Sequence, residues 1–187
     1  MLKRAFDIVV SLGGLAVGWP VLLTLAVLVR LTSPGPAVHW SRRVGRENRE
    51  FPMPKFRSMR TDTPDVATHL LEDPGRWITP IGRFLRKSSL DELPQLWSVL
   101  VGDMSLVGPR PALFNQHDLI ELRTAAGVER LRPGVTGWAQ VNGRDELPIP
   151  EKVKLDAEYL TRQSLAFDLA IILATARQAV TGRGVSH

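Results

Sequence analysis

Cysteine is absent from this chain of 187 residues. Its absence excludes a disulfide framework, a zinc-thiolate site and a cysteine nucleophile, so any metal must bind through oxygen or imidazole ligands. The four histidines have no metal-ligand spacing, which disfavours a transition-metal site. The chain also contains no G-x-x-x-x-G-K-[ST] loop, no kinase signature and no G-x-G-x-x-G after a strand pattern. These absences argue against ordinary nucleoside-triphosphate chemistry.

Acidic residues are fewer than basic ones, 19 against 24, which gives a formal net charge of +5. This balance predicts an anionic partner, which could be nucleic acid, an acidic membrane surface or a phosphate-rich substrate. No recognised nucleic-acid-binding module is present, so nucleic acid is not expected as a partner. The length fits one catalytic domain with an added element rather than two enzyme domains.

Residues 8–29 form an uncharged, apolar run long enough to cross a bilayer as a helix of about 20 residues. Basic residues flank both ends, Lys3 before it and Arg30 after it, so the positive-inside rule assigns no outward side. Pro20 lies in the middle, where its ring kinks or breaks a helix. We expect residues 1–36 to be a re-entrant helix-break-helix that returns to the cytosolic face; a single crossing helix is the alternative.

The rest of the chain, residues 37–187, predicts a small catalytic domain of mixed α/β type that is mainly helical. Residues 38–60 read as basic extended segments with a turn at 45–48. Helices are expected over about 112–126, 151–163 and 167–180, and a glycine-rich loop over 131–144.

The segment SSLDELPQLW at 88–97 places two adjacent carboxylates, Asp91 and Glu92, in an apolar frame. Ser89 with Glu92 three residues later matches a capping box, and Ser88 is a second suitable cap. The pair is then expected in the first turn of a helix, where the helix dipole keeps both carboxylates ionised. Capping alone would explain the pair without any further function.

Basic side chains are concentrated in or beside loops rich in glycine and proline. Pro109 and Pro111 fix the backbone on either side of Arg110. Such loops present guanidinium groups to phosphate or, equally, to anionic lipid headgroups. Carboxylates combined with phosphate binders suggest phosphoryl transfer with a bridging Mg²⁺ ion. The basic residues are Lys55, Arg57, Arg60, Arg83, Arg86, Lys87, Arg110, Arg132 and Arg144.

Six motifs are spread along almost the whole chain: KRAFD at 3–7, KFRSM at 55–59, SLDELPQLW at 89–97, GDMSLVGPRP at 102–111, RPGVTGWAQVNGR at 132–144 and LDAEYL at 155–160. Together they resemble the motifs of the bacterial sugar transferases, the small monotopic phosphoglycosyl transferases. The resemblance implies a re-entrant membrane helix, amphipathic helices in the membrane interface and a catalytic domain on the cytosolic face of the bacterial inner membrane. It also implies transfer of a sugar phosphate from a UDP-sugar to undecaprenyl phosphate with release of UMP, the first membrane step of surface-glycan assembly.

The resemblance implies roles for particular residues. Asp91 matches the nucleophile that forms a covalent sugar-phosphate intermediate, and Glu92 matches its partner, expected to help bind Mg²⁺ or to assist proton removal. Both carboxylates are therefore candidate metal ligands. The other candidates bind substrate or phosphate; they are Lys55, Arg57, Pro109, Arg110, Pro111, Asn142, Gly143, Arg144, Asp156 and Asp168. Lys55 and Arg57 could equally face lipid, and Asp156 and Asp168 could be structural.

The sugar is not specified by these motifs, and we expect a UDP-N-acetylhexosamine. Anionic lipids are expected partners, and the amphipathic surface permits a homodimer. Two alternatives are left open: a hydrolase in which water resolves the intermediate, and a non-enzymatic membrane-anchored module that docks glycan-assembly partners.

Overall fold

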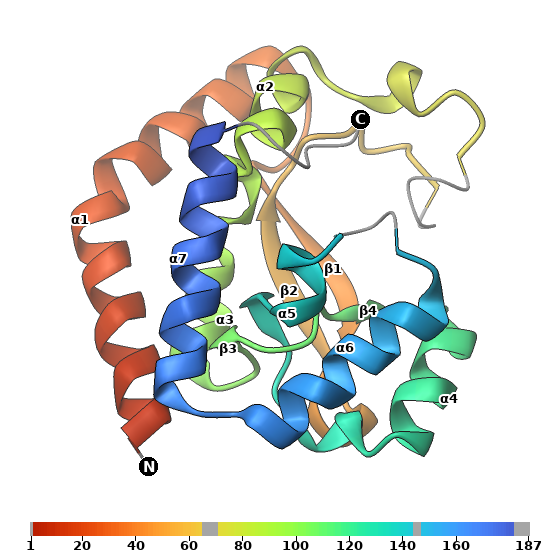
Figure 1. Ribbon diagram of the computed structural model, residues 1–187. Helices are drawn as coiled ribbons and strands as arrows, with labels where there is room; N and C mark the ends of the chain where they lie inside the picture. Colours follow the sequence, from red (N-terminus) through yellow and green to blue (C-terminus); the bar gives the residue numbers. More distant parts are fainter. Residues whose placement is uncertain (1, 65–70, 144–146, 182–187) are drawn as a thin grey trace.

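The structure, a computed structural model, describes residues 2–64, 71–143 and 147–181, apart from the side chains of residues 180 and 181. It confirms a mixed α/β fold dominated by helices (Figure 1). The helices are α1 (Leu2–Thr32), α2 (Pro80–Ser88), α3 (Gln95–Val101), α4 (His117–Ala125), α5 (Trp138–Val141), α6 (Ile149–Arg162) and α7 (Leu165–Thr181). The strands are β1 (Val38–Val44), β2 (Glu50–Phe56), β3 (Ser105–Val107), β4 (Ala112–Leu113) and β5 (Gly134–Thr136).

The basic segment after α1 folds into a β-hairpin, as its sequence predicts. β1 pairs antiparallel with β2 on one side and with β4 on the other. The hairpin turn includes Glu47 and Asn48, both with positive φ. Pro52 and Pro54 lie in β2, at the sheet edge, where a residue without an N–H is tolerated.

The second sheet is a parallel pair, β3 and β5, and its glycines let two backbones meet closely. A Cβ atom on Gly134 would lie 2.1 Å from the backbone nitrogen of Gly108, and one on Gly108 would lie 2.3 Å from the carbonyl oxygen of Arg132. Neither position can therefore hold a side chain without moving the backbone. This contact holds the Gly108–Pro111 turn, which follows β3, close to the backbone of residues 132–134.

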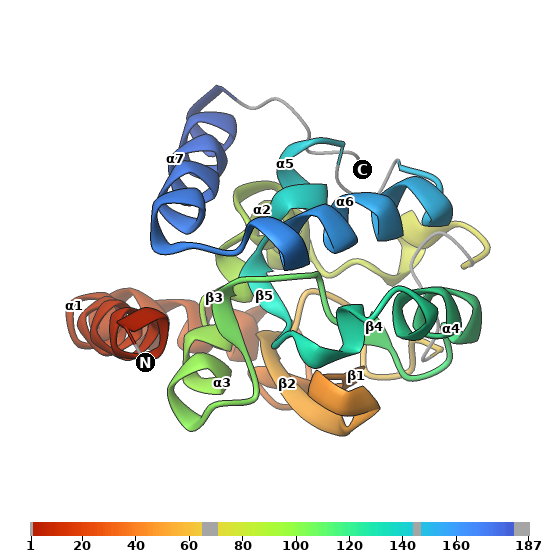
Figure 2. The same ribbon diagram turned by 60° about the horizontal axis from the view of Figure 1, so that its bottom comes forward.

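The main core lies between the sheets and the helices α3, α6 and α7. Its largest fully buried side chains include Tyr159 of α6, Ile171 of α7 and Met104. Figure 2 shows α6 and α7 on one side of the β3–β5 pair and α3 with the β-hairpin on the other. The two helices predicted at 151–163 and 167–180 are thus confirmed as α6 and α7, within two residues at each end.

The apolar N-terminal segment forms one helix, α1, which is long and apolar enough to cross a membrane by length and composition. The expected division into two helices is absent: the helix continues through Pro20, and the Thr24 hydroxyl donates to the Pro20 carbonyl at 2.8 Å. Figure 1 shows that α1 nevertheless changes direction along its length, as a helix with an internal proline does.

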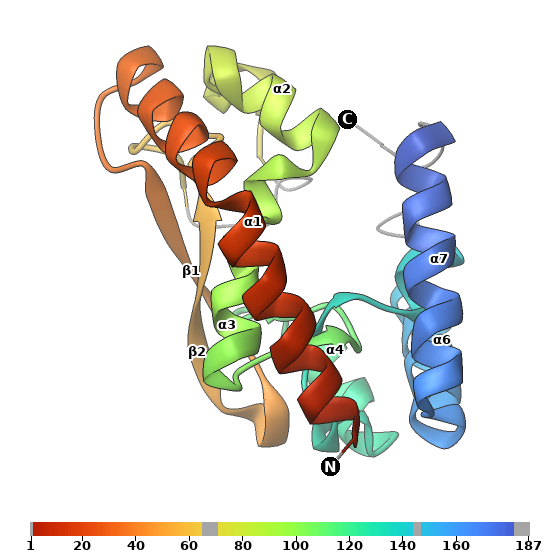
Figure 3. The same cartoon turned by 90° about the vertical axis from the view of Figure 1, so that its left-hand side faces the viewer.

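Both ends of α1 are attached to the same globular body. At its start, Arg4 donates to the carbonyls of Val99 and Leu100 in α3. Towards its end, Leu25 and Val29 are buried in a small apolar cluster with Phe56 and Leu85. Between these attachments large side chains are exposed, among them Val17 at 83% and Trp19 at 60%. Figure 3 shows α1 crossing one face of the molecule from end to end.

Candidate active site

The Asp91–Glu92 pair lies in a short 3₁₀ turn, Leu90–Glu92, between α2 and α3. The predicted capping box is wrong, because the Ser89 side chain makes no capping hydrogen bond and its φ is +56°. Ser89 instead ends α2, with its N–H directed to the carbonyls of Arg86 and Leu85. Pro94 precedes the first residue of α3, Gln95, so the helix begins after the pair and not at Ser89.

Glu92 is held by two cations. One of its oxygens, Oε1, accepts from Lys55 Nζ at 2.8 Å and from Arg110 Nη2 at 3.1 Å. The Glu92 side chain is only 19% exposed. Burial opposes ionisation, but the two cations outweigh it and hold the pKa of Glu92 well below its usual range. Glu92 is therefore ionised at every physiological pH.

Asp91 has a different environment. It is 9% exposed, and among the described residues no hydrogen bond or ion pair to its carboxylate is found. Burial raises the pKa of Asp91, with Lys55 acting against this and the neighbouring Glu92 adding to it. The sequence predicts both carboxylates in the first turn of a helix and both ionised; the structure places them before α3, and their pKa values shift in opposite directions. Lys55 and Arg110 bind Glu92, whereas among the described residues no cation binds Asp91.

Cations from three elements act on the pair through their charge: Lys55 of β2, Arg110 of the turn after β3 and Arg86 of α2. Burial lowers the pKa of Lys55, which Glu92 opposes and Arg43 of β1 reinforces. Arg86 is among the basic residues that the sequence singles out, whereas Arg43 was not predicted. Their positions depend on how α2 and β1 fold onto the pair.

The Pro109–Pro111 turn that carries Arg110 is held at three successive carbonyl groups. The carbonyl of Pro109 accepts from the backbone N–H of Gly134 at 2.8 Å. Those of Arg110 and Pro111 accept from Arg123 Nη1 at 2.8 Å and from Arg43 Nη1 at 3.2 Å. Pro109 and Pro111 restrict φ on each side of Arg110, so the backbone that carries the Arg110 side chain is rigid.

Arg57 is not brought to the carboxylate pair. It is buried and binds the chain just after α1, donating to the carbonyls of Pro34 and Ser33 and to the Ser33 hydroxyl. Burial lowers the pKa of Arg57, and the nearby Arg30 contributes in the same direction. The structure places Arg57 at the exit of α1, where it fixes the end of the helix.

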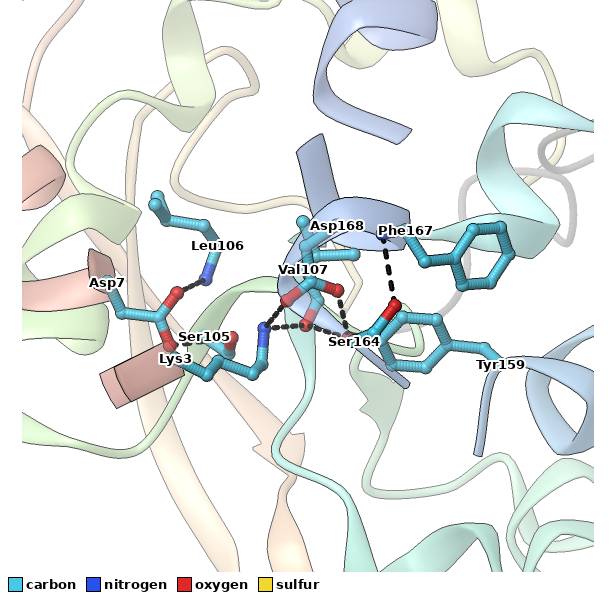
Figure 4. Close-up of polar contacts among 9 residues, drawn as sticks. All are labelled: Lys3, Asp7, Ser105, Leu106, Val107, Tyr159, Ser164, Phe167 and Asp168. Atoms are coloured by element: carbon cyan, nitrogen blue, oxygen red, sulfur yellow. Dashed lines mark hydrogen bonds and ion pairs between the residues drawn. The ribbon is translucent and has the colours of Figure 1, made fainter. Parts of the chain in front are cut away.

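Two of the predicted acidic residues are buried in ion pairs away from Asp91. Asp156 on α6 accepts from Arg123 at 2.7 and 3.0 Å and is 1% exposed. Asp168 on α7, also 1% exposed, accepts from Lys3 and from the Tyr159 hydroxyl, each at 2.6 Å (Figure 4). Burial and Asp168 raise the pKa of Tyr159, so the phenol remains a donor.

The same network ties the start of α1 to β3. Lys3 Nζ donates to the carbonyl of Val107 at 3.2 Å, and the Tyr159 hydroxyl oxygen lies at the same distance from this carbonyl. Asp7 accepts from the Ser105 hydroxyl and the Leu106 N–H (Figure 4). β3 therefore connects the N-terminal turn of α1 directly to the turn that carries Arg110.

The predicted nucleotide loop is described only in part. Asn142 is exposed, and its amide donates to the Trp138 carbonyl at 2.8 Å. Gly143 has a φ of +158°, and a Cβ there would lie 2.6 Å from Leu147. Arg144 lies outside the described residues.

The donor set is compatible with Mg²⁺. Across the described parts of the chain, no three acidic or histidine side chains are grouped to hold a metal on their own. Mg²⁺ commonly takes only one or two protein carboxylates and completes its shell with water and substrate phosphates. Asp91 can provide one such ligand. The second oxygen of Glu92 can provide another, because the hydrogen bonds from Lys55 and Arg110 both end on the first oxygen, Oε1.

Comparison with known proteins places this chain in context. The family described as "Bacterial sugar transferase" matches residues 1–182. The chain is 44% identical over 176 residues to a UDP-glucose:undecaprenyl-phosphate glucose-1-phosphate transferase of Xanthomonas campestris pv. campestris, covering 90% of this chain and 36% of that protein. It therefore spans about a third of that relative's length.

Two further relatives differ in length and in name. The uncharacterized sugar transferase EpsL of Bacillus subtilis (strain 168) is 40% identical over 187 residues, covering 100% of this chain and 91% of EpsL. A UDP-N-acetylgalactosamine-undecaprenyl-phosphate N-acetylgalactosaminephosphotransferase of Aeromonas hydrophila is 37% identical over 188 residues, covering 98% of this chain and 44% of that protein.

Proposed function

Because the chain belongs to the bacterial sugar transferase family, we propose that it transfers a sugar 1-phosphate from a UDP-sugar to undecaprenyl phosphate. The relatives named for this reaction cover nearly the whole chain. The observation that carries the proposal is the unequal carboxylate pair. Asp91 is buried and, within the part of the chain that the structure describes, has no cation bound to it, whereas the adjacent Glu92 binds two cations.

We propose that Asp91 is the nucleophile. One of its oxygens attacks the β-phosphorus of the UDP-sugar, and the bond from that phosphorus to the bridging oxygen breaks. UMP leaves with the bond's electrons, and the sugar phosphate remains on Asp91. An oxygen of undecaprenyl phosphate then attacks the same phosphorus, which releases the Asp91 carboxylate and forms the lipid diphosphate sugar.

Glu92 acts in this mechanism as a holder of cations. A carboxylate with a strongly lowered pKa is a poor proton acceptor, so of the two roles expected from the sequence, proton removal is disfavoured. By binding Lys55 and Arg110 together, Glu92 keeps both cations beside Asp91, where negative charge develops on the phosphoryl oxygens.

Mg²⁺ bound through Asp91 and Glu92 would neutralise charge on the diphosphate and polarise its oxygens. Lys55 and Arg110 supply further positive charge from the protein itself.

The attachments of α1 support the proposal that it is a re-entrant membrane helix, with the catalytic domain on the cytosolic face of the bacterial inner membrane. Both of its ends contact one body, and its exposed apolar middle lies between them. Two helices that contact α1 also expose large apolar side chains: Phe84 of α2, and Trp97 and Val101 of α3. Arg83 and Lys87 beside Phe84 suit anionic lipid headgroups.

Single cysteines test this topology cleanly, because the natural chain has none. Ala5→Cys and Leu31→Cys should both be labelled by a membrane-impermeant maleimide only from the cytosolic side. Val17→Cys, in the exposed middle, is the control and should resist labelling from either side. Labelling of one end from outside would mean that α1 crosses the membrane.

The donor is best identified by following UMP release. The UDP-N-acetylhexosamine expected from the sequence stays a prediction, since relatives of similar identity are named for glucose and for N-acetylgalactosamine. The protein in nanodiscs is incubated with Mg²⁺ and a panel of UDP-sugars, with and without undecaprenyl phosphate. Catalytic UMP release that requires lipid and disappears in Asp91→Asn supports the transferase. Sugar phosphate released to water without lipid would favour a hydrolase.

A further inference from the structure

Arg123, an arginine on α4, helps to hold the turn that carries Arg110 by donating to the Arg110 carbonyl. All three nitrogens of its guanidinium donate hydrogen bonds, two of them to one carboxylate oxygen and the third to this carbonyl. Nε and Nη2 donate to Oδ2 of Asp156 at 3.0 and 2.7 Å, and Nη1 donates to the carbonyl of Arg110 at 2.8 Å. Arg123 is 8% exposed and Asp156 is 1% exposed, so neither side chain is available to a substrate.

The planar guanidinium makes this arrangement directional. When the carboxylate fixes two of its nitrogens, the direction of the third is also fixed. That third nitrogen holds the peptide group between Arg110 and Pro111. A rotation of this peptide group turns the Arg110 side chain away from Glu92, which it now reaches at 3.1 Å.

We propose that Arg123, oriented by Asp156, is a positioning residue that sets the direction of the Arg110 side chain and thereby its grip on the substrate diphosphate. This inference rests on the proposed transfer reaction. It gives Asp156 a role behind the site in place of substrate binding, and it adds Arg123, which the motifs did not single out.

A double-mutant cycle tests the proposal, with kcat/KM for UMP release as the readout. Arg123→Lys keeps the charge and can still pair with Asp156, but one ammonium group cannot reproduce the fork. We expect it to lower kcat/KM by about 10- to 100-fold, since a displacement of about 1 Å costs up to about 10²-fold. In an Arg110→Ala background the same substitution should cost less than about 3-fold, because the side chain being positioned is gone. Asp156→Asn should behave in the same way.

Val153→Ala is the matched control. Val153 is on α6, one turn from Asp156, and is buried with Leu119 of α4, so its truncation loosens the same helix pair without touching the ion pair. It should lower the melting temperature, and its effect on kcat/KM should be equal with and without Arg110. If Arg123→Lys also lowered kcat/KM by equal factors in both backgrounds, its role would be structural and the proposal overturned.

Calorimetric binding of UDP to the same variants separates this inference from the proposed reaction. If the wild-type protein binds UDP, and Arg123→Lys weakens binding only when Arg110 is present, the positioning role is supported even when no UDP-sugar yields UMP. The transfer reaction would then be refuted on its own. Equal weakening in both backgrounds, or no UDP binding by the wild-type protein, overturns the positioning role.

Discussion

Two buried aspartates have opposite environments: Asp91, in the turn before α3, and Asp168, in the first turn of α7. Asp168 accepts from Lys3 and Tyr159, so its charge is balanced inside the fold. Asp91 is also largely buried, but two of the cations near it, Lys55 and Arg110, are bound to Glu92. Asp168 therefore holds elements together through its ion pair, whereas the Asp91 carboxylate has no hydrogen bond or ion pair among the described residues.

The largest difference between the two regions should appear in catalysis. Asp91→Asn removes the proposed nucleophile and should lower UMP release by at least about 10⁴-fold, as removal of a nucleophile does in other enzymes. Asp168→Asn should retain activity within about 10-fold per folded molecule, because Asp168 acts on the fold rather than on the substrate. The comparison would fail if Asp91→Asn kept substantial UMP release under the donor that the wild-type protein uses.

For the stability of the fold, the larger effect is expected from Asp168→Asn and the smaller one from Asp91→Asn. Asp168→Asn leaves Lys3 without its buried anionic partner, which typically costs about 3 kcal/mol. For a chain of this size the melting temperature should fall by roughly 6–12 °C. Thermal unfolding in nanodiscs measures this, with Asp62→Asn as the control, since Asp62 forms an exposed pair with Arg60 that should contribute little. A fall as small as that of the control would show that the buried pair does not hold α1.

Removing the charge of Glu92 or of Lys55 should shift the pH dependence of the first step, the attack of Asp91 that releases UMP, in opposite directions. Asp91 must be ionised to attack, and burial raises its pKa, so the acid limb should lie above the ordinary aspartate range. Glu92→Gln removes a charge that raises this pKa and should move the limb to lower pH. Lys55→Met removes a charge that lowers this pKa and should move the limb to higher pH.

The burst of UMP without lipid acceptor is the measurement for these variants, because the acceptor phosphate then contributes no titration. If the acid limb moved in the same direction in Glu92→Gln and in Lys55→Met, it would not report the ionisation of Asp91.

The smallest expected effect is on the stability of Asp91→Asn. The pKa of Asp91 is higher in the folded than in the unfolded protein. The folded protein therefore loses stability as the pH rises from the unfolded-state pKa through the folded-state pKa. The asparagine side chain of this variant cannot ionise, so at pH 7.5 the variant should melt at or slightly above the wild-type temperature. The difference should shrink as the pH falls towards the ordinary range of aspartate. A clear loss of stability at pH 7.5 would indicate that the Asp91 carboxylate has stabilising partners.

Much of the fold could be predicted because its longest elements carry local patterns. The hairpin and the helices α6 and α7 follow from alternation, apolar spacing and turn residues. β3, β4 and β5 were missed, since strands of two or three residues exist only through pairing with distant segments. The helix expected over 112–126 is shorter for the same reason: its first two residues form β4, and α4 begins at His117.

The sequence singles out candidate site residues from their neighbours in the chain, but it does not show which distant residues they contact. Asp91, Glu92 and Arg110 were singled out by their immediate context, and the structure brings Glu92 and Arg110 together. Lys55 and Arg57 are two residues apart, but β2 ends at Phe56, so one reaches Glu92 and the other reaches Ser33. The cationic partner of Asp168, Lys3, is 165 residues away, and that of Asp156, Arg123, is 33 residues away; no local motif indicates contacts over such separations.

The most direct test is the mass of the protein after reaction with its UDP-sugar in the absence of lipid. The wild-type chain should gain the mass of one sugar phosphate, on the peptide that contains Asp91, and lose it when undecaprenyl phosphate is added. Asp91→Asn should gain nothing, while Asp168→Asn should be labelled like the wild type. Rapid lipid-dependent UMP release with no adduct on the wild-type chain would contradict the covalent role of Asp91 and favour direct attack by the lipid phosphate.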